Sequence, residues 1–182
     1  MLNFKERYIK KVIPAMKDKF GYGNDMAVPK IEKVIINVGI GSASGEAERV
    51  EEIVSSLREI TGQNPVKTKA KKAISGFKIR AGQEVGIKIT LRGKRMWHFI
   101  DRLVDIAFPR TRDFQGIDSS KSIDSSGNLN VGIKEHIVFP EIHPEKVKNI
   151  FSFQINVATT AKNKKEGKEL FKSLGFPLKD EN

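Results

Sequence analysis

Residues 85–92 alternate strictly between apolar and other side chains, which is the two-residue period of a β-strand. The same half-polar alternation occurs within residues 33–40, 129–133 and 151–157. Strands of this kind form antiparallel sheets that are covered on one side only. The sequence therefore predicts an α+β fold, in which helices pack on one face of an antiparallel sheet and the other face remains open.

Helical spacing of apolar residues predicts the helices of this fold. The predicted helices cover about residues 3–20, 46–60, 95–107 and 163–174. Asn3 is placed to cap the first helix with Glu6 as its reciprocal partner, and Pro14 should kink or split it. Pro109 should end the third helix. The buried stripe of the second helix is predicted to be Ala47, Val50, Val54, Leu57 and Thr61.

The remaining segments should form connections around one compact domain that spans residues 1–182. Lysines alternate along residues 65–70 after Pro65, which is typical of an edge strand. Residues 72–84 contain glycines and should form a flexible loop. Residues 110–127 are rich in Ser, Asp and Gly and predict a long surface loop, and residues 135–149 predict irregular structure.

The open face of the predicted sheet would be polar and partly basic. It would carry the side chains of Asn37, Lys88, Thr90, Arg92, Asn130 and Gln154. Such a face could bind RNA, or it could simply face water. The alternation alone does not decide between these two interpretations.

The distribution of charge favours an anionic partner. Of the formal net charge of +11, residues 67–112 account for +10, since they hold 13 Lys and Arg against 3 Asp and Glu. Clustered like charges repel one another in a folded protein. A nucleic-acid phosphate backbone would compensate them, although a solvated basic face remains the alternative.

The basic segment includes a loop with an aromatic residue. Phe77 lies among two glycines and several cations, which are Lys67, Lys69, Lys71, Lys72, Lys78 and Arg80. Lysines and arginines can neutralise phosphates, and an aromatic ring can stack on a base. We expect RNA contact here; the alternative is a mobile loop with Phe77 packed in the core.

Several classes of function lack support in the sequence. The chain has no cysteine, which excludes disulfides and zinc–thiolate sites. The N-terminus lacks the apolar region of a signal peptide, and no apolar run is long enough for a membrane span, so we expect a soluble intracellular protein. Glu135, Glu141 and His143 lack the spacing of a metal site. No pattern of catalytic residues is present, and we expect no enzyme, cofactor or small-molecule substrate.

A glycine-rich turn at residues 39–45 could suggest nucleotide binding. Its glycines read G-x-G-x-x-x-G between a strand and a helix. The dinucleotide fingerprint is one residue shorter, and the lysine-rich segment after the helix is a poor buried strand. A tight turn that lets the helix pack on the sheet explains the pattern as well.

Several blocks of this sequence resemble the bacterial form of the universal large-subunit ribosomal protein number five, the 5S rRNA-binding family. The most specific block is LREITGQNPVKTKAKKAISGFKIRAGQEVGIKITLRG at residues 57–93. Further blocks are MLNFKERY at the N-terminus, NVGIG at 37–41, FPRTRDFQGI at 108–117 and GIKEHIVFPEI at 132–142. The resemblance covers the whole chain.

The resemblance implies a structural protein of the large ribosomal subunit, located in the cytoplasm, that attaches 5S rRNA in the central protuberance. The implied partners are 5S rRNA, large-subunit rRNA, the P-site tRNA and small-subunit ribosomal protein thirteen. The implied 5S rRNA contacts are Asn37, Gln63, Thr90, Lys67, Lys69, Lys88, Arg92 and Lys94.

Two further sites are implied by the resemblance. The loop that reaches the tRNA corresponds to Lys71, Lys72, Ser75, Gly76, Phe77, Lys78 and Arg80. The intersubunit bridge corresponds to Arg110, Arg112, Asp113, Phe114 and Gln115, together with the irregular segment near 136–143. The alternatives are an RNA-binding regulator outside the ribosome and a nucleotide-binding enzyme that uses the 39–45 turn.

Overall fold

The computed structural model describes residues 3–41, 46–77, 79–112 and 114–179. The chain divides into two compact units, and each is described by itself. Unit 1 comprises residues 1–34, 91–131 and 156–182, and unit 2 comprises residues 35–90 and 132–155.

The main strands form one five-stranded antiparallel sheet in the order β2-β3-β1-β6-β5, and the predicted α+β class is confirmed. The strands are β1 (Ile31–Gly39), β2 (Val66–Lys69), β3 (Glu84–Leu91), β5 (Leu129–Ile133) and β6 (Phe153–Thr159). As predicted, the lysine-bearing strand β2 lies at an edge. The alternation in β1, β3 and β6 matches their burial, because Ile36, Ile89 and Ile155 are buried while Asn37 and Gln154 are exposed.

The N-terminal helical segment of unit 1 contains α1 (Phe4–Arg7), the π-helix η1 (Tyr8–Val12) and α2 (Ile13–Phe20). The predicted cap is confirmed, since Asn3 accepts a hydrogen bond from the Glu6 N–H at 2.8 Å. Pro14 lies in the first turn of α2, directly after the π-helix. A proline cannot donate the usual backbone hydrogen bond, and the wider π turn accommodates it without ending the helix.

The third predicted helix shows the same device, and the prediction that Pro109 ends it is wrong. The segment runs through α4 (Gly93–Arg102), the π-helix η5 (Leu103–Ala107) and α5 (Phe108–Arg110), so Pro109 lies inside the last turn. Pro109 cannot donate a backbone hydrogen bond, and the wider turns of the preceding π-helix accommodate it, so the helical segment continues to Arg110.

The composition predicted one long surface loop over residues 110–127, and this prediction is wrong. These residues include β4 (Ile117–Asp118), which pairs in parallel with β7 (Leu178–Lys179), and the short helix α6 (Ser119–Ser122). Ile117, Ser119 and Ile123 are buried. The segment is therefore part of the packed body of unit 1, although its composition resembles that of a loop.

The C-terminal helix of unit 1 is α7 (Lys164–Leu174), and it ends at the left-handed residue Gly175. Gly167 packs directly on the backbone of Gly127: a Cβ built on Gly167 would lie 2.5 Å from the Gly127 Cα. Neither glycine can carry a side chain without a shift of backbone. This close approach fixes α7 against the turn that precedes β5.

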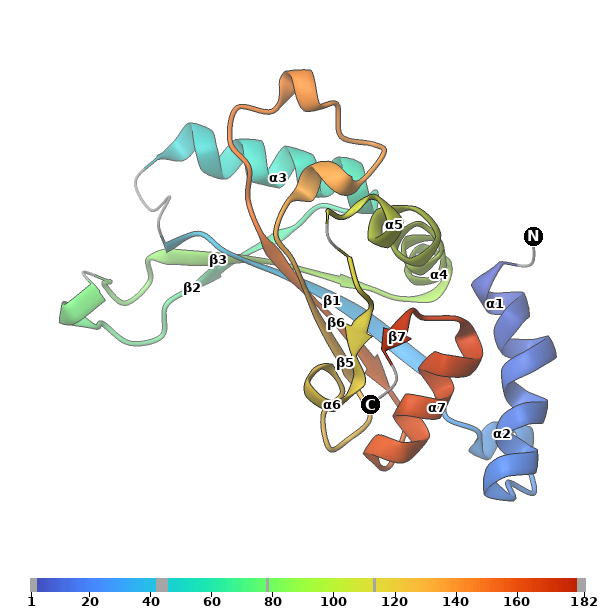
Figure 1. The fold of residues 1–182 in the computed structure, drawn as a ribbon. Coiled ribbons are helices and arrows are strands. Elements are labelled where there is room, and N and C mark those ends of the chain that lie inside the picture. The colour runs from blue at the N-terminus through green and yellow to red at the C-terminus, as the bar shows by residue number, and fades with distance from the viewer. Residues whose placement is uncertain (1–2, 42–45, 78, 113, 180–182) are drawn as a thin grey trace. The chain divides into compact units, whose positions relative to one another are not determined.

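In unit 2, α3 (Ala47–Thr61) covers one face of the strands, and it ends at Gly62 with a φ of 66° (Figure 1). Its buried stripe differs in part from the prediction. Ile53 and Ile60 are buried with Val50, Leu57 and Thr61, whereas Ala47 is exposed and Val54 is half-buried.

Residues 134–152 of unit 2 lie on the same side of the strands as α3 and contain only the short 3-10 turns η6 (His136–Val138) and η7 (Pro144–Lys146) (Figure 1). The irregular structure predicted here is confirmed. The segment is tied to α3 by Glu52, which accepts hydrogen bonds from the Lys148 N–H at 2.8 Å and the Asn149 side chain at 3.0 Å.

Candidate nucleic-acid interface

The face of β1 and β3 that points away from α3 is polar in unit 2. Asn37 and Lys88 are exposed and Thr90 is half-buried, while the alternate residues of the same strands are buried. Figure 1 shows no helix of unit 2 on this side of the strands, within the residues described. The face thus presents an amide, a hydroxyl and an ammonium group at neighbouring strands.

Gln63 joins this face from the end of α3. Its side-chain amide donates a hydrogen bond to the Thr90 carbonyl oxygen at 3.2 Å, where β2 no longer pairs with β3. Its backbone is held by Thr61, whose hydroxyl donates to the Leu57 carbonyl at 2.7 Å and accepts from the Gln63 N–H at 3.3 Å. Gln63 and Thr90 are therefore brought together, as the resemblance implied, by a contact that spans 27 positions in the sequence.

The register of β2 separates Lys67 from this group. Lys67 is directly opposite Ile87, a buried residue, so it lies on the side of the sheet that α3 covers. Its ammonium group pairs with the Glu84 carboxylate at 3.3 Å. Lys69 follows an irregularity in the ladder and is exposed. Lys88 is exposed on the strand face that also carries Asn37.

A glycine lets β2 and β3 approach closely on the open face. Gly86 lies opposite Thr68, and a Cβ on Gly86 would stand 2.8 Å from the Thr68 hydroxyl oxygen and 3.3 Å from the Val38 carbonyl oxygen. The absence of a side chain at Gly86 leaves a shallow stretch of backbone between Thr68 and β1. Such a surface allows a close approach of another backbone.

Residues 70–77 and 79–83 form a hydrogen-bonded hairpin arm that extends β2 and β3, within the segment 72–84 that was predicted to be a flexible loop. Ile74 and Ile79 exchange backbone hydrogen bonds of 2.9 and 3.1 Å, and Ala70 pairs with Gln83 and Gly82 at 2.8 and 2.9 Å. The 3-10 turn η4 (Ser75–Phe77) closes the tip. We call residues 70–83 the hairpin arm.

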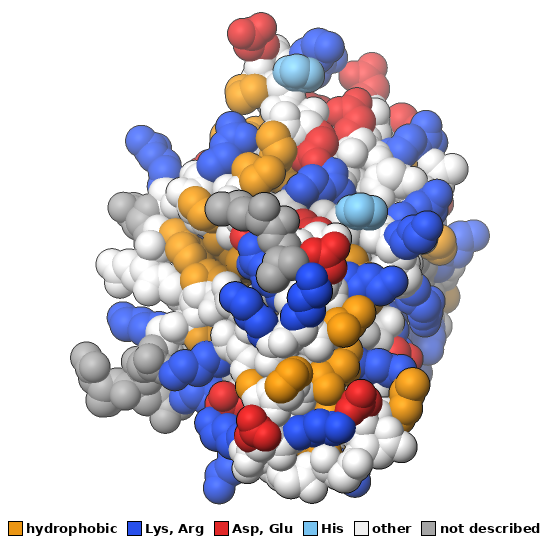
Figure 2. Space-filling view, turned by 90° about the vertical axis from the view of Figure 1, so that its right-hand side faces the viewer, with side chains coloured by type: hydrophobic (Ala, Val, Ile, Leu, Met, Phe, Trp, Pro, Cys, Tyr) orange, Lys and Arg blue, Asp and Glu red, His pale blue; other side chains and the backbone are white. Residues whose placement is uncertain are grey.

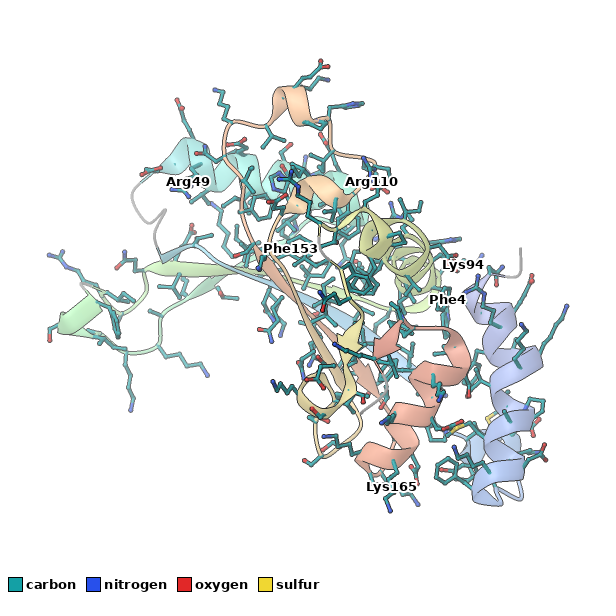
Figure 3. All side chains as sticks on the ribbon, viewed as in Figure 1. Phe4, Arg49, Lys94, Arg110, Phe153 and Lys165 are labelled. Atoms are coloured by element: carbon teal, nitrogen blue, oxygen red, sulfur yellow. The ribbon has the colours of Figure 1, made fainter. Side chains whose placement is uncertain are left out.

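The tip of the hairpin arm exposes an aromatic ring among cations. Phe77 is 76% exposed, which rules out the alternative that it packs in the core. Lys71, Lys72 and Arg80 are exposed, as are Ser75 and Gly76, whereas Lys78 lies outside the described residues. The arm projects away from the rest of unit 2, and its side chains point outward (Figure 3). An exposed ring flanked by cations can stack on a nucleotide while the cations contact phosphates.

Arg92 and Lys94 belong to unit 1, so the structure does not place them beside the other residues predicted to bind 5S rRNA. Arg92 precedes α4 and makes no side-chain cap there, and the first turn of α4 holds no acidic residue. Figure 3 labels Lys94 at this end of α4. Cations at a helix N-terminus oppose the helix dipole, at a cost of about 0.3–1 kcal/mol each when exposed.

The residues predicted for the intersubunit bridge differ in their surroundings. Arg110, Arg112 and Gln115 are exposed, and Asp113 lies outside the described residues. Phe114 is half-buried and its ring stacks on Phe108 at 5.1 Å between centroids, which gives it a packing role. The segment 136–143 lies in unit 2, apart from these residues in the division of the chain.

Basic side chains are not confined to residues 67–112. Figure 2 shows lysine and arginine side chains over much of one face of the molecule, with acidic side chains among them. Several of the acidic groups form ion pairs, such as Asp105 with Arg7 at 3.4 Å and Glu169 with Lys19 at 2.5 Å. The local balance of charge therefore depends on which carboxylates are already paired.

The surroundings of the 39–45 turn carry charges of both signs. Residues 42–45 lie outside the described residues. A cavity of about 440 Å³ beside Ile40 is lined by Glu46, Glu51 and Glu84 together with Lys67. A second cavity, of about 780 Å³, lies along α3, where Glu48 and Glu52 line it together with Arg49, Lys146 and Lys148.

Neither a metal centre nor a membrane span is found in the part of the chain that the structure describes. Among these residues, no three His, Asp or Glu side chains are grouped to hold a metal ion. Glu135, Glu141 and His143 therefore do not form such a group. Among the same residues, no helix has both the length and the apolar character needed to cross a bilayer.

Sequence reasoning missed a buried polar cluster behind the 134–152 segment. His136 is fully buried and its ring stacks on Phe151, with centroids 4.0 Å apart. The Phe151 N–H donates to its Nδ1 at 3.4 Å, and its Nε2 has no partner among the described atoms. Burial lowers the pKa of His136, although the Glu52 carboxylate opposes this. The histidine adjoins an irregular sequence, and no periodic signal marks it.

At Glu52, in contrast to His136, hydrogen bonds outweigh the effect of burial on the pKa. Burial would raise its pKa, but the hydrogen bonds from the Asn149 side chain and from the Lys148 and Asn149 N–H groups hold the pKa of Glu52 below its ordinary value. The carboxylate thus stays ionised and anchors the 134–152 segment to α3. Its position on α3 suggested only a surface residue.

Taken together, the fold and this face describe a polar surface with a basic arm, and the comparison with known proteins identifies the family. Residues 24–80 match the family model described as ribosomal protein L5, and residues 84–178 match the model for the C-terminus of the same ribosomal family. The chain is 49% identical over 178 residues to the large ribosomal subunit protein uL5 of Desulforamulus reducens, which covers 98% of each chain. It is 47% identical to that of Carboxydothermus hydrogenoformans, over 98% of this chain and 99% of the other, and 46% identical to that of Brevibacillus brevis, over 96% and 97%.

The chain belongs to the L5 family of ribosomal proteins. It is therefore a structural constituent of the large ribosomal subunit and not an enzyme, with rRNA and the ribosome as its partners in the cytoplasm. The resemblance stated from the sequence is confirmed, and the nucleotide-binding enzyme is excluded.

Proposed function

We propose that this protein binds 5S rRNA through the open face of β1 and β3 and helps to attach it in the central protuberance of the large subunit. The observation that carries the proposal is the group formed by Asn37, Gln63, Lys88 and Thr90 on an uncovered strand face. Membership of the L5 family supports an RNA partner. Uncharged hydrogen-bond donors and acceptors that lie close together on an open strand face are suited to contact the hydroxyl groups and bases of RNA.

Different side chains of this face would provide specificity for RNA shape and salt-dependent affinity. The amides of Asn37 and Gln63 and the hydroxyl of Thr90 can read 2′-hydroxyl groups and base edges, which report the shape of RNA. The Lys88 ammonium adds a phosphate contact that weakens as salt rises. The hydrogen bond from Gln63 to the Thr90 carbonyl holds the Gln63 amide in place before RNA arrives, so less side-chain freedom is lost on binding.

The hairpin arm is proposed to contact the P-site tRNA. Its support is an exposed Phe77 ring with Lys71, Lys72 and Arg80 on a paired backbone that extends from the sheet. The contact must accept every tRNA, so it is directed at phosphates and stacking and not at base identity. Lys78, Ser75 and Gly76 are included in this proposal.

The intersubunit bridge is proposed to involve the exposed residues Arg110, Arg112 and Gln115, with small-subunit ribosomal protein thirteen as the partner. Asp113 is part of the same proposal. Phe114 acts by packing on Phe108, which holds the turn between α5 and β4. The support is the exposure of these side chains and the membership of the chain in the L5 family.

The test of the main proposal is a double variant, Asn37→Ala with Lys88→Gln. Both side chains are exposed, so the fold should survive. We expect about tenfold weaker binding of 5S rRNA in a filter-binding titration, since a net hydrogen bond contributes about 0.5–1.5 kcal/mol and a phosphate contact is lost. Binding of a P-site tRNA mimic by the arm should stay within about twofold.

A control variant with Ser55→Ala and Lys146→Gln makes the same change of charge on the α3 side of unit 2, where both residues line the cavity of about 780 Å³ along α3. It should bind 5S rRNA like the parent protein. Equal affinity of the parent, the double variant and the control would contradict the proposed site. A protein found free of ribosomal particles in fractionated lysate would favour the regulator alternative.

A further inference from the structure

We infer that Gln83 is a positioning residue of the hairpin arm, whose side chain fixes the backbone of Arg80 and so sets the shape of the arm. The inference rests on the proposed tRNA contact of the arm, and it names a residue that acts through Arg80 without touching RNA itself. Gln83 is half-buried and lies at the base of the arm, directly before β3.

The hairpin arm has little packing that could set its shape. All residues from 71 to 77 are exposed. Figure 1 shows the arm beyond the ends of β2 and β3. A segment with few buried contacts and solvent-exposed backbone hydrogen bonds opens easily. The shape of the arm therefore depends on the hydrogen bonds within it.

The ladder between β2 and β3 does not continue regularly into the arm. Its register shifts, so that the pairs Thr68–Gly86 and Lys69–Glu84 enclose one extra residue of β3, which is Val85. An extra residue of this kind bends its strand. The direction of the chain beyond this irregularity is therefore set by the first hydrogen bonds of the arm.

Gln83 makes most of those first hydrogen bonds. Its carbonyl oxygen accepts from the Ala70 N–H at 2.8 Å, across the hairpin. Its N–H donates to the Arg80 carbonyl oxygen at 3.2 Å, and its side-chain Oε1 accepts from the Arg80 N–H at 3.0 Å. Gly82 completes the turn with a φ of 84°, which favours glycine, and donates to the Ala70 carbonyl oxygen at 2.9 Å. One residue thus binds both backbone polar groups of Arg80.

This arrangement acts directly on a cation of the proposed tRNA contact. Arg80 lies between the base at Gln83 and the pair formed by Ile74 and Ile79, whose backbone hydrogen bonds are 2.9 and 3.1 Å long. Its side chain is exposed. A contact residue whose backbone is held before binding loses less conformational freedom when the ligand arrives. The Gln83 side chain therefore supports affinity without a contact of its own.

The first test measures the shape of the arm in the full-length protein without RNA. The chain has no cysteine, so nitroxide labels can be attached at Ser75→Cys on the arm and Ser55→Cys on α3, both exposed positions of unit 2. Double electron–electron resonance then gives the distribution of distances between the two labels. Thermal unfolding verifies that each variant folds.

Three variants are compared in this labelled protein. Gln83→Met keeps an unbranched side chain but removes the acceptor, and we expect a broader distribution of distances. Gln83→Glu keeps the acceptor for the Arg80 N–H and should retain the distribution of the parent. The matched control is Gln154→Met, at an exposed glutamine of β6 in unit 2, and it should also resemble the parent.

The second test measures binding of the unlabelled protein to a deacylated tRNA in a filter-binding titration. Gln83→Met should bind about fivefold more weakly, which is the effect that one hydrogen bond supplies. In an Arg80→Gln background the same substitution should cause no further loss, because residues that act through one contact are not additive. The affinity of Gln83→Met for 5S rRNA should be unchanged.

Equal distance distributions for the parent and Gln83→Met would overturn the inference, as would the same broadening in Gln83→Glu or Gln154→Met. Unchanged tRNA affinity in Gln83→Met, or an equal loss with and without Arg80, would also overturn it. If the parent does not bind tRNA but Gln83→Met still broadens the distribution, the proposed tRNA contact fails and the role of Gln83 in shaping the arm stands.

Discussion

At the scale of single residues, close packing and burial leave no room for a larger or charged side chain at several positions. Gly167 and Gly127 meet at backbone distance, and Gly86 leaves room for Thr68 at the sheet edge. His136 is buried with one ring nitrogen unpartnered among the described atoms. Each of these residues makes stability depend sharply on a small chemical change.

Substitution of Gly167 with alanine should destabilise the protein. The new Cβ would lie 2.5 Å from the Gly127 Cα and carbonyl oxygen, which are backbone atoms that cannot rotate away. Overpacking of this kind costs about 1–3 kcal/mol. Urea unfolding should show the loss, while Gly23→Ala, whose Cβ meets nothing within 4 Å, should leave the midpoint nearly unchanged. Equal midpoints for both variants would contradict the packing argument.

The buried His136 should make stability depend on pH. Its pKa is lowered in the folded protein, so the unfolded chain takes up a proton at a pH where the native protein does not. Its contribution is complete above the ordinary value of 6.5 and is lost as the pH falls from there toward the lowered native value.

The measurement is the free energy of unfolding between about pH 7 and pH 5 for the parent, His136→Phe and His98→Asn. The His136 variant should have the flatter profile in this window, because its group no longer titrates on unfolding. The His98→Asn variant, which replaces an exposed histidine, is the control for the loss of one imidazole. Glu52, with a lowered pKa, contributes stability that is lost only below its ordinary value of 4.5.

At the scale of elements, the hairpin arm shows how an ordered extension can be dispensable for folding. Its backbone hydrogen bonds close within residues 70–83, and its exposed apolar residues Ile74 and Phe77 contribute little to the core. The arm is therefore free to carry a function that is independent of the stability of the sheet.

We expect Phe77→Ser to leave the unfolding midpoint within experimental error and to weaken the tRNA contact. Stacking on an aromatic ring contributes about 1–3 kcal/mol per base, so the affinity for tRNA should fall by about fivefold or more. Binding of 5S rRNA to the same variant should be unchanged. A loss in both RNAs would mean that the arm and the strand face form a single site.

At the scale of the whole molecule, net charge and specific contacts should be separable by salt. A charge of +11 predicts binding to any RNA at low salt, with log K falling by about 0.7–0.9 per neutralised phosphate against log salt. We expect 5S rRNA to keep a preference over tRNA and a scrambled RNA at high salt, because the polar face is proposed to recognise the shape of 5S rRNA. Equal affinities throughout a filter-binding salt series would indicate a generic polyanion binder.

The sequence by itself determined the fold class, the edge strand and the helix cap at Asn3, because alternation, charge and backbone preference act over a few residues. The sequence also identified the family, because the resemblance covers the whole chain. The helix breaks were misread at Pro109, because a π-helix five residues long changes the position of the proline relative to the backbone hydrogen bonds.

Only the tertiary structure decided which polar residues come together. The register of β2 against β3 put Lys67 on the covered side and Lys88 on the open side, and Gln63 reached Thr90 across 27 positions. The engagement of Glu166 and Glu169 also depends on partners outside α7, which are the Lys162 N–H and the Lys19 ammonium group. Pairing between strands and between helices is set by the packing of the whole unit, which local periodicity does not encode.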